Sequence, residues 1–573
     1  MRPSLPTLHV HVVTNKALAR PLKDTAALIE LTGGNPFRAR AFASAARTLE
    51  RMEESAAELT RAELTAVRGI GKSIAGDVRE LVETGTLAVR DELLATLPPE
   101  LPDVLRVKGL GPKKVRRLWQ DLGVTSLDDL EAAAVAGRIA DLDGFGAKTQ
   151  DTILAQIDTL RTYQGRRHFA TAHADVAPLL AALREAEGIT AVEPAGAFRR
   201  ALETVGEVEL VTAGNADAVR AVLDAQGCTG AQTDGAFFEG ALPDGLALVV
   251  HHTEASRFGV ELWVRTGSPD HVAAFVEAHG QPDEADTEAA VYERVGLAVV
   301  PPELREGTDE LQRAAAGSLP DLVTLADLRG SLHNHSTYSD GAHTLRDMAE
   351  AARASGLTYF GICDHSRSLK VANGLSIERL REQIGEVRVL NAEYEAAGID
   401  FRVFSGSEVD ILKDGSLDYP DDVLAELDLV VASVHTHFSM TEAEATERLV
   451  RAVSHPHVHI LGHPTGRLLL RREGYPLDHA AVIEACAAHG VALELNANPY
   501  RLDLDWRYVR AATDAGVLVA INPDAHSIEQ LDLIRWGVAV ARKGGLTAAQ
   551  CLNAMERDAF AAWLVAKGEA VSR

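Results

Sequence analysis

The chain has 573 residues, which is too long for one hydrophobic core, so we expect several domains. A hydrophobic content of 46% and a charged content of 24% are typical of a globular protein, and no apolar run is long enough to span a bilayer. The formal net charge of −26 argues against a nucleic-acid partner, but basic residues cluster locally, so the global charge excludes little.

Residues 1–21 contain a short apolar stretch, Leu8–Val13, which is interrupted by histidines and is too short for a signal peptide. We therefore expect an N-terminal extension and a cytoplasmic protein without a membrane partner. The four cysteines lie far apart in the sequence, so the pattern indicates neither a disulfide framework nor a thiolate zinc site.

Residues 22–165 have helical periodicity that is broken by short glycine turns. Three turns share an apolar-x-Gly-apolar-Gly pattern at the start of a helix, and a lysine follows each. Free N–H groups at a helix N-terminus can bind phosphate. The turns resemble the helix-hairpin-helix motif and predict DNA binding through phosphates rather than bases. The predicted DNA-binding residues are Gly69, Gly71, Lys72, Gly109, Gly111, Lys113, Lys114, Gly144, Gly146 and Lys148.

The spacing of the first two turns, with Asn35–Ala41 upstream, resembles the N-terminal and fingers domains of family X DNA polymerases. The helical region is divided accordingly into residues 22–95 and residues 96–165. In lyase-competent members, a Schiff-base lysine lies in the helix after the first turn, and the matching position here is Asp77. The resemblance therefore does not imply 5′-deoxyribose-phosphate lyase activity.

Residues 166–260 mix strands with helices, and Gly196–Val211 resembles the palm motif of the same family. That motif implies a turn that holds a nucleotide triphosphate, followed by two carboxylates that bridge two magnesium ions. The candidate nucleotide-binding residues are Gly196, Arg199 and Arg200, and the candidate catalytic residues are Glu207 and Glu209. The family has aspartates in place of these glutamates. Since Mg²⁺ requires near-ideal octahedral geometry, the longer side chains predict nucleotide transfer that is weak, manganese-dependent or absent.

The third palm aspartate of the family falls on Val249, which cannot bind a metal. His251 lies two residues further along the predicted strand, on the same face. It is either a replacement ligand or an ordinary solvated histidine. Downstream, residues 261–320 carry Thr266–Ser268 and Pro301–Gly307, which resemble thumb and linker signatures of bacterial members.

From Leu328 onward, strand-like runs alternate with helical segments and predict a barrel of parallel strands over residues 328–573. The predicted strands are residues 359–362, 401–404, 429–432, 460–461, 492–495 and 517–521. Barrel enzymes place their chemistry at the C-terminal ends of such strands. Polar residues follow the runs there: Asp364, His365, Glu408, His435, His437, His463, Asn496, Asn498, Asp524 and His526.

The stretch Ser331–Gly341 contains His333 and His335, which would share one face of a strand, and Asp340 in the turn that follows. With the residues at the strand ends, it resembles the PHP (polymerase and histidinol phosphatase) phosphoesterase family. The whole chain is therefore similar to a bacterial family X polymerase with a C-terminal PHP domain. The implied fold is multidomain: an all-α helix-hairpin-helix region, an α/β polymerase-beta-like palm and thumb, and a distorted TIM-like (β/α) barrel.

The PHP resemblance also implies two to three divalent ions, Mn, Zn or Fe, and a ligand set that the chain matches at all nine positions. One ion would be held by His333, His335, Glu408 and Asp524, a second by Glu408, His435 and His463, and a third by Asp340, His365 and His526. The implied catalytic residues are Glu408, Asp340 and His365. One departure is Ser331, where the family usually has an acidic residue behind the ligands; another is Pro523.

Clustered divalent ions lower the pKa of a bound water and neutralise a phosphodiester. The leading hypothesis is a DNA-repair enzyme whose PHP domain hydrolyses DNA phosphodiesters, as a 3′ to 5′ exonuclease or in end processing. Its partner would be gapped, nicked or 3′-ended DNA.

Two alternatives remain. One is a gap-filling polymerase that uses nucleotide triphosphates and Mg or Mn at the palm, with PHP editing. The other is a non-catalytic DNA-end scaffold. A small-molecule phosphatase would leave the three DNA-binding turns unexplained. Arg367 and Lys370 could bind substrate phosphate or be solvated.

Overall fold

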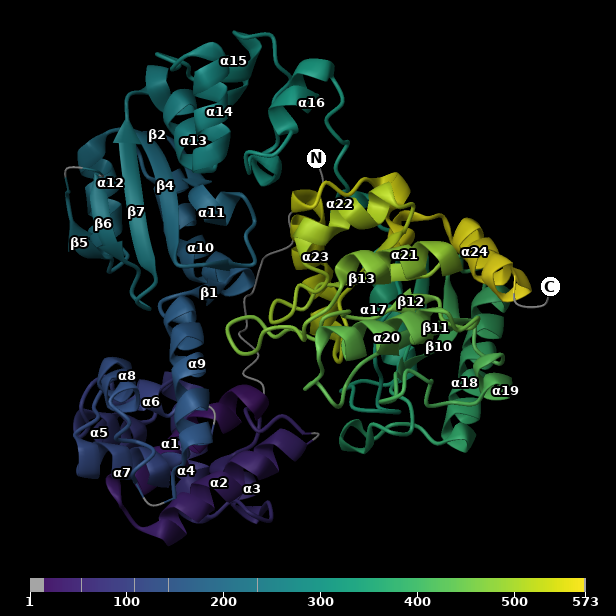
Figure 1. Ribbon diagram of the computed structural model, residues 1–573, viewed down its shortest axis with the longest axis horizontal. Helices are drawn as coiled ribbons and strands as arrows, with labels where there is room; N and C mark the ends of the chain where they lie inside the picture. The colour runs from purple at the N-terminus through teal and green to yellow at the C-terminus, as the bar shows by residue number, and fades with distance from the viewer. Residues whose placement is uncertain are drawn as a thin grey trace. The chain divides into compact units, whose positions relative to one another are not determined.

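The computed structural model describes residues 15–52, 54–107, 109–142, 144–233, 235 and 237–570. The chain forms two compact units, Met1–Gln164 and Gly165–Arg573 (Figure 1). Their boundary lies between Gln164 and Gly165. Within the described residues, no helix is both long and apolar enough to cross a membrane.

The first unit is all-α, as predicted. Its helices are α1 (Asn15–Thr32), α2 (Pro36–Arg51), α3 (Arg61–Ala66), α4 (Lys72–Thr84), α5 (Ala88–Ala95), α6 (Leu101–Val104), α7 (Pro112–Leu122), α8 (Leu127–Val135) and α9 (Ala147–Tyr163). They enclose two hydrophobic clusters, one around Phe42 and Val78 and one around Leu118 and Ile157.

Helix α1 begins before residue 22, so the predicted extension is too long. Leu18, Ala19 and Leu22 are buried in the first cluster. This packing outweighs the helix-breaking tendency of Pro21, which lies inside α1. Residues 1–14 of the predicted extension lie outside the described residues.

The palm in the second unit is built on a five-stranded sheet of order β2-β4-β7-β6-β5. The strands are β2 (Ile189–Ala195), β4 (Glu207–Gly214), β5 (Thr229–Ala231), β6 (Phe238–Ala241) and β7 (Ala247–Thr253); a separate pair is β1 (Arg167–His168) with β3 (Thr204–Val205). One face of the sheet packs its apolar side chains against α10 (Phe169–Glu185) and α12 (Ala216–Ala225). Helix α11 (Gly196–Arg199) follows β2.

The thumb follows as α13 (Phe258–Thr266), α14 (Pro269–His279), α15 (Glu288–Glu293) and α16 (Glu310–Ala316). The predicted palm–thumb boundary lies inside α13. Leu262 packs on the palm with Ala195 and Val211, whereas Trp263 is buried in the thumb core. Helix α13 therefore contributes to the hydrophobic packing of both the palm and the thumb.

A seven-stranded parallel sheet of order β14-β13-β12-β11-β10-β9-β8 confirms the predicted barrel. Its strands are β8 (Gly330–Ser331), β9 (Tyr359–Ile362), β10 (Arg402–Asp410), β11 (Leu429–Ser433), β12 (Ile460–Leu461), β13 (Ala492–Asn496) and β14 (Val519–Asn522). Parallel pairing of Asn334 with Ala525 brings the two edges together, so the barrel is nearly closed. Strand β10 runs past the predicted end at Phe404, which places Glu408 inside the strand.

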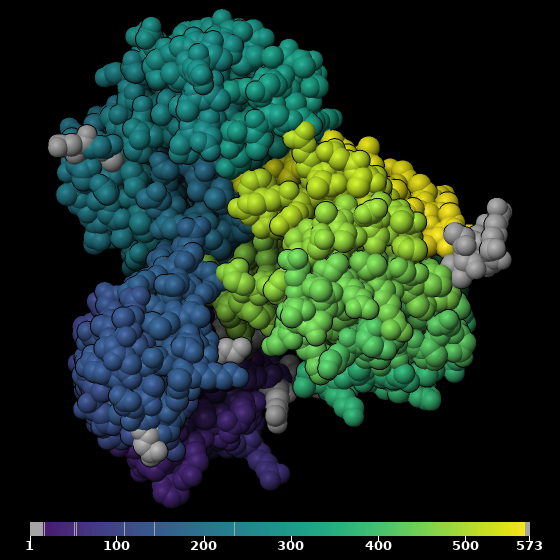
Figure 2. All heavy atoms as spheres, viewed as in Figure 1, coloured from purple at the N-terminus to yellow at the C-terminus, as the bar shows by residue number. Residues whose placement is uncertain are grey.

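Helices cover the outside of the barrel: α17 (Leu345–Ala354), α18 (Ile377–Ala396), α19 (Asp421–Leu424), α20 (Glu442–Val453), α21 (His479–His489), α22 (Trp506–Asp514), α23 (Ile534–Lys543) and α24 (Arg557–Ala570) (Figure 1). Their buried faces and the strands form the main core, and the green and yellow atoms of this region form one rounded body in Figure 2. Short 3-10 turns occur at Ala255–Arg257, Pro302–Leu304, Leu325–Asp327, Lys370–Ala372, Ile528–Leu533, Ala548–Gln550 and Leu552–Ala554.

Candidate metal centre and nucleic-acid interface

All nine predicted metal ligands meet at the C-terminal ends of the barrel strands. His333 and His335 follow β8, His365 follows β9, and Glu408 lies near the end of β10. The other ligands follow later strands and the first turn: Asp340, His435, His463, Asp524 and His526. Most of these side chains are buried, whereas Asp340 is exposed at the rim.

Glu408 lies at the middle of the cluster. Its Oε1 is 3.2 Å from Nε2 of His435 and 2.9 Å from Nε2 of His463. Its Oε2 is 2.8 Å from Nδ1 of His365 and 3.3 Å from Nε2 of His333. One carboxylate therefore faces four imidazoles.

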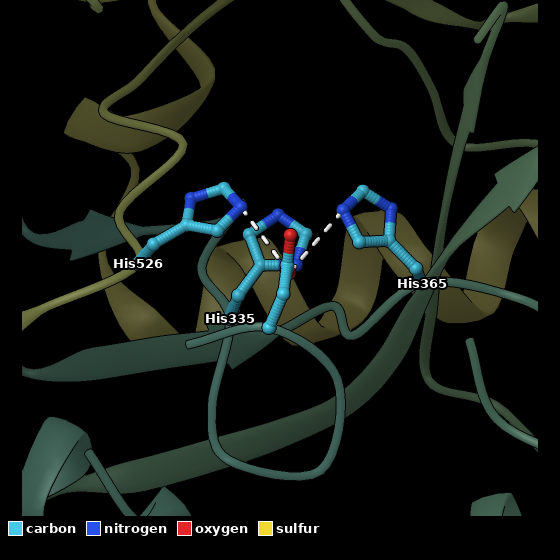
Figure 3. Close-up of side chains that lie close together, drawn as sticks. His335, His365 and His526 are labelled. Carbon is cyan, nitrogen blue, oxygen red and sulfur yellow. Dashed lines mark ion pairs between the residues drawn. The ribbon is translucent and has the colours of Figure 1, made fainter. Parts of the chain in front are cut away.

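A second group of ligand atoms gathers around Asp340. Its Oδ1 lies 3.5 Å from Nε2 of His365 and 3.4 Å from Nε2 of His526. Figure 3 shows the imidazoles of His335, His365 and His526 converging from three separate segments. Ligand atoms of these four residues all lie within 4.8 Å of one another, so His335 joins the group predicted without it.

A third group consists of His333, His335 and Asp524. Nε2 of His335 lies 3.1 Å from Oδ1 of Asp524. Asp524 adopts a φ of 51°, a left-handed conformation that is costly for a residue with a side chain. The backbone thus stores strain at a ligand position, as is common at functional sites.

The charges of the cluster favour a cation. Burial opposes ionisation of Glu408, but the surrounding imidazoles outweigh it and hold the pKa of this carboxyl well below its usual range. Burial, together with His526 and His365, lowers the pKa of His335 to about 3. Burial opposes protonation of His435 and His526, but Glu408 and Asp410 raise the pKa of His435 to about 10, and Asp340 and Asp524 raise that of His526 to about 9. Metal binding at these rings therefore competes with protons, since histidine binds metals in its neutral form.

Buried polar atoms in the cluster lack protein partners. Nε2 of His333 and Oε2 of Glu408 are both buried without a hydrogen bond, although they lie 3.3 Å apart. Buried polar groups are nearly always satisfied, so these two atoms are candidate ligands of an ion. The residues present therefore fit divalent ions, and their imidazole and carboxylate donors suit Mn²⁺, Zn²⁺ or Fe²⁺.

The three glycine turns of the first unit share one geometry. The first glycine of each turn has a positive φ, which is 103° at Gly69, 89° at Gly109 and 81° at Gly144. The second glycine is the N-cap of the helix that follows, α4, α7 or α9, and has no side-chain cap. The N-terminal N–H groups of the three helices are therefore free of a cap side chain.

Exposed lysines follow each turn: Lys72, Lys113 and Lys148. Lys114 differs from them, because its Nζ donates to the backbone oxygen of Gly109 at 3.2 Å. It also lies over the ring of Phe145. Lys114 is thus held within the turn, while the other three lysines point to solvent.

Comparisons with known proteins agree with these features. A family model of the PHP domain matches residues 331–498, a helix-hairpin-helix domain matches residues 13–87, and a SAM-like helix-hairpin-helix tandem matches residues 101–159. A protein of Bacillus subtilis (strain 168), DNA polymerase/3'-5' exonuclease PolX, is 36% identical over 565 residues, which are 94% of this chain and 97% of its own. The chain belongs to the bacterial family X DNA polymerases with a C-terminal PHP domain.

Two further relatives are named probable phosphatases. One, from Thermoanaerobacter sp. (strain X514), is 27% identical over 232 residues, 39% of this chain and 88% of its own. The other, from Escherichia coli O81 (strain ED1a), is 30% identical over 206 residues, 34% of this chain and 78% of its own. The long match to the polymerase covers the DNA-binding turns, the palm and the barrel together.

The palm of this family X member departs from an aspartate site. Val249 lies next to Glu209 in the register of β4 and β7 and carries no donor atom. His251 is buried, and its Nε2 lies 3.4 Å from Oε2 of Glu209. Gly196 has a φ of 62°, and an added Cβ there would lie 2.1 Å from Oε1 of Glu209. A side chain at this position would therefore displace the Glu209 carboxylate and strain the left-handed backbone.

Both candidate nucleotide-binding arginines of the palm are paired with glutamates from the thumb. Arg199 bonds Glu288 at 2.6 Å, and Arg200 bonds Glu306 at 2.9 Å. A nucleotide triphosphate would have to compete with these carboxylates.

Two acidic residues that the sequence analysis did not identify contact the histidines of the barrel centre through their second ring nitrogen. Nδ1 of His333 lies 2.7 Å from Glu494, and Nδ1 of His435 lies 2.6 Å from Asp410. Glu494 sits in the buried strand β13, and a charged residue in such a strand is a signal that could have revealed it. Asp410 lies on the same face of β10 as Glu408, two residues away.

Other polar residues at the strand ends have structural roles. Asp364 is fully buried and accepts hydrogen bonds from Ser336 and Ser339, so it fixes the loop between His335 and Asp340. Asn496 donates to both Glu494 and Asp524. Asn498 accepts from Tyr500 N in a local turn, and His437 is exposed.

One sequence departure, Ser331, and one candidate phosphate-binding residue, Arg367, now have a structural account. Ser331 donates to Asn334 rather than to a histidine, and Glu494 on β13 supplies the acidic partner of His333. Arg367 bonds Asp418 at 3.1 Å, so its guanidinium is occupied within the fold, whereas Lys370 is exposed.

Proposed function

We propose that the chain is a cytoplasmic DNA-repair enzyme whose PHP barrel hydrolyses DNA phosphodiesters, as a 3′ to 5′ exonuclease or in end processing. The observation that carries this proposal is the convergence of nine metal-binding side chains around the buried Glu408 carboxylate. The Bacillus subtilis relative is named as a 3'-5' exonuclease, which supports the same substrate class.

The residues of the barrel centre would have separate roles in hydrolysis. Two or three divalent ions would supply a hydroxide near neutral pH and neutralise the phosphate charge. Glu408 would bridge between ions, held ionised by its imidazole neighbours. Asp340 and His526 lie at the more exposed side of the cluster, where a DNA phosphate can approach.

The first unit would hold the DNA by its backbone. The N-termini of α4, α7 and α9 present free N–H groups beside exposed lysines. This arrangement attracts phosphates and carries no means of reading bases. Gapped, nicked or 3′-ended DNA would therefore bind without sequence preference.

A second candidate function is nucleotide transfer by the palm, weak or dependent on Mn²⁺. Glu207 and Glu209 keep two carboxylates on one face of β4, in favour of a residual site. Val249 and the paired arginines Arg199 and Arg200 oppose efficient transfer. The palm would then extend DNA ends that the barrel trims.

An end-labelled primer annealed to a longer template separates these functions. With Mn²⁺ alone, the proposed exonuclease shortens the primer; with nucleotides added, an active palm lengthens it. A scaffold that only binds DNA ends changes the primer in neither reaction, and that result would overturn the proposal.

A further inference from the structure

The loops that follow β12 and β13 are joined at the end of the barrel that carries the metal ligands. The backbone N of Leu469 donates to the backbone oxygen of Tyr500 at 2.7 Å, and Nε of Arg467 donates to the backbone oxygen of Arg501 at 2.9 Å. Asn498 holds the same segment from within, since its Oδ1 accepts from the backbone N of Tyr500 at 3.1 Å. The backbone of residues 500 and 501 is therefore held from two sides.

Tyr500 presents an exposed aromatic ring on this segment, where the residue is 60% exposed. The ring packs against His168, with the ring centres 4.7 Å apart and the planes inclined by 71°. Nε2 of His168 in turn donates to the backbone oxygen of Leu469 at 3.0 Å. One exposed ring means little by itself. A ring that is held in place beside basic side chains, however, is the arrangement that stacks the bases of single-stranded nucleic acid.

Three arginines of these two loops lie close to one another. Nε of Arg501 is 3.9 Å from Oδ2 of Asp524, a candidate metal ligand. Burial and the charges of Arg501 and Arg471 lower the pKa of Arg472, so the three guanidinium groups repel one another. Within the part of the chain that the structure describes, Arg471 and Arg472 form no ion pair, and Nε of Arg472 is buried without a hydrogen bond. Positive charge therefore remains unneutralised beside the metal ligands, where a phosphate would neutralise it.

We infer that these two loops bind the 3′-terminal nucleotides of a DNA strand: the last base stacks on Tyr500, Arg501 contacts the phosphate at the metal centre, and Arg471 contacts the phosphate next to it. Arg501 is placed for this contact, because a phosphate that binds beside Asp524 comes within reach of its guanidinium group. Stacking accepts every base, so the site agrees with DNA binding without sequence preference. The inference rests on the proposed function, since it assigns contacts to the DNA substrate of the barrel.

Photocrosslinking in the full chain tests the contact with the base. A single-stranded oligonucleotide carries 5-iodouracil as its 3′-terminal base, which crosslinks to an aromatic side chain stacked on it. A phosphorothioate at the last linkage of the oligonucleotide slows its hydrolysis. After irradiation in the presence of Mn²⁺, peptide mapping should locate the crosslink at Tyr500. The control is an oligonucleotide with the iodinated base in its middle, which should not crosslink to Tyr500.

The kinetics of shortening test the same site with an unmodified strand. Tyr500→Ala should raise KM roughly 5- to 150-fold, the loss expected for one base stack, and leave kcat close to that of the wild type. Tyr500→Phe keeps the ring and should rescue this loss. Arg501→Ala should also raise KM, whereas Arg388→Ala, which removes an exposed arginine on α18, should not.

The two experiments separate failure of this inference from failure of the proposed function. An equal KM in the wild type and Tyr500→Ala, or crosslinks of the terminal base that avoid Tyr500, would overturn the inference. A wild type that crosslinks at Tyr500 but leaves the unmodified strand intact would support the contact and overturn the proposed function instead.

Discussion

Nδ1 of His333 lies 2.7 Å from Oε1 of Glu494, and both side chains are fully buried. The contact fixes the ring so that Nε2 faces Glu408, 3.3 Å away. Glu494 also accepts hydrogen bonds from the backbone N of His463 and the side chain of Asn522. One carboxylate in β13 therefore orients ligands that come from β8 and β12.

Removing the charge of Glu494 should weaken the metal centre. We predict that Glu494→Gln lowers metal affinity by about 10- to 100-fold, because carboxylates behind metal-bound histidines contribute this much. Metal content after dialysis and the rate of primer shortening measure the effect. Glu426→Gln removes a partly exposed glutamate that pairs with Arg381, away from the metal centre, and should change neither. Unchanged metal content in Glu494→Gln would contradict this role.

The exposed lysines of the three turns should set the strength of DNA binding. We predict that Lys72→Ala, Lys113→Ala and Lys148→Ala each weaken binding to duplexes of any sequence. Because each of these lysines would neutralise one phosphate, each substitution should reduce the slope of log K against log salt by about 1. Fluorescence anisotropy at several salt concentrations measures both quantities.

The control for these lysines is Arg388→Ala, which removes an exposed basic residue on helix α18 of the barrel. Its affinity and salt slope should match those of the wild type. If the lysine variants also match the wild type, DNA is held elsewhere.

An ion pair joins the thumb to the barrel within the second unit. Arg510 bonds both carboxylate oxygens of Asp309, at 2.6 and 2.7 Å. The hydrogen bonds from Arg510 and Arg313 lower the pKa of Asp309 to about 2, below its ordinary 3.8. A carboxyl whose pKa is lower in the folded state than in the unfolded state stabilises the fold at any pH above its unfolded-state pKa. This stabilisation is lost as the pH falls through the pKa of the folded state.

We therefore predict that Asp309→Asn lowers the free energy of unfolding of this unit by about 0.5 to 1 kcal/mol at neutral pH, the range of a partly exposed pair. The difference from the wild type should be constant above pH ~4 and shrink toward pH ~2. Urea unfolding at a series of pH values measures it. If the difference in unfolding free energy between the wild type and Asp309→Asn grew as the pH fell, the result would contradict this prediction.

Much of the barrel could be predicted from the sequence. Short apolar runs such as Tyr359–Ile362 and Ile460–Leu461 are strands with the predicted bounds, because parallel strands buried on both faces are continuously apolar. Most of the ligand residues could be identified because they follow such a run, whereas His333, His335 and Asp340 form a local motif of their own. Glu408 lies inside β10, beyond the predicted end of that strand. The helical start at Asn15 was missed because Pro21 marked a boundary that packing overrides.

Contacts across the fold could not be predicted in the same way. Glu494 acts on His333 from a strand 161 positions away, and no local pattern joins them. Glu209 and Glu239 lie on either side of Val249 only through the order β4-β7-β6, in which consecutive strands of the chain are not all neighbours. Sheet order and register are tertiary properties, so candidate partners of this kind need the structure.

The central claim is that the barrel centre around His333 and His335 hydrolyses DNA. The most direct test measures primer shortening by His333→Ala with His335→Ala, with DNA affinity followed by anisotropy in the same preparation. Glu207→Gln with Glu209→Gln is the matched control, because it alters the palm alone. The account predicts that the histidine variant loses shortening and keeps its DNA affinity, while the control keeps both. Persistent shortening by the histidine variant would contradict it.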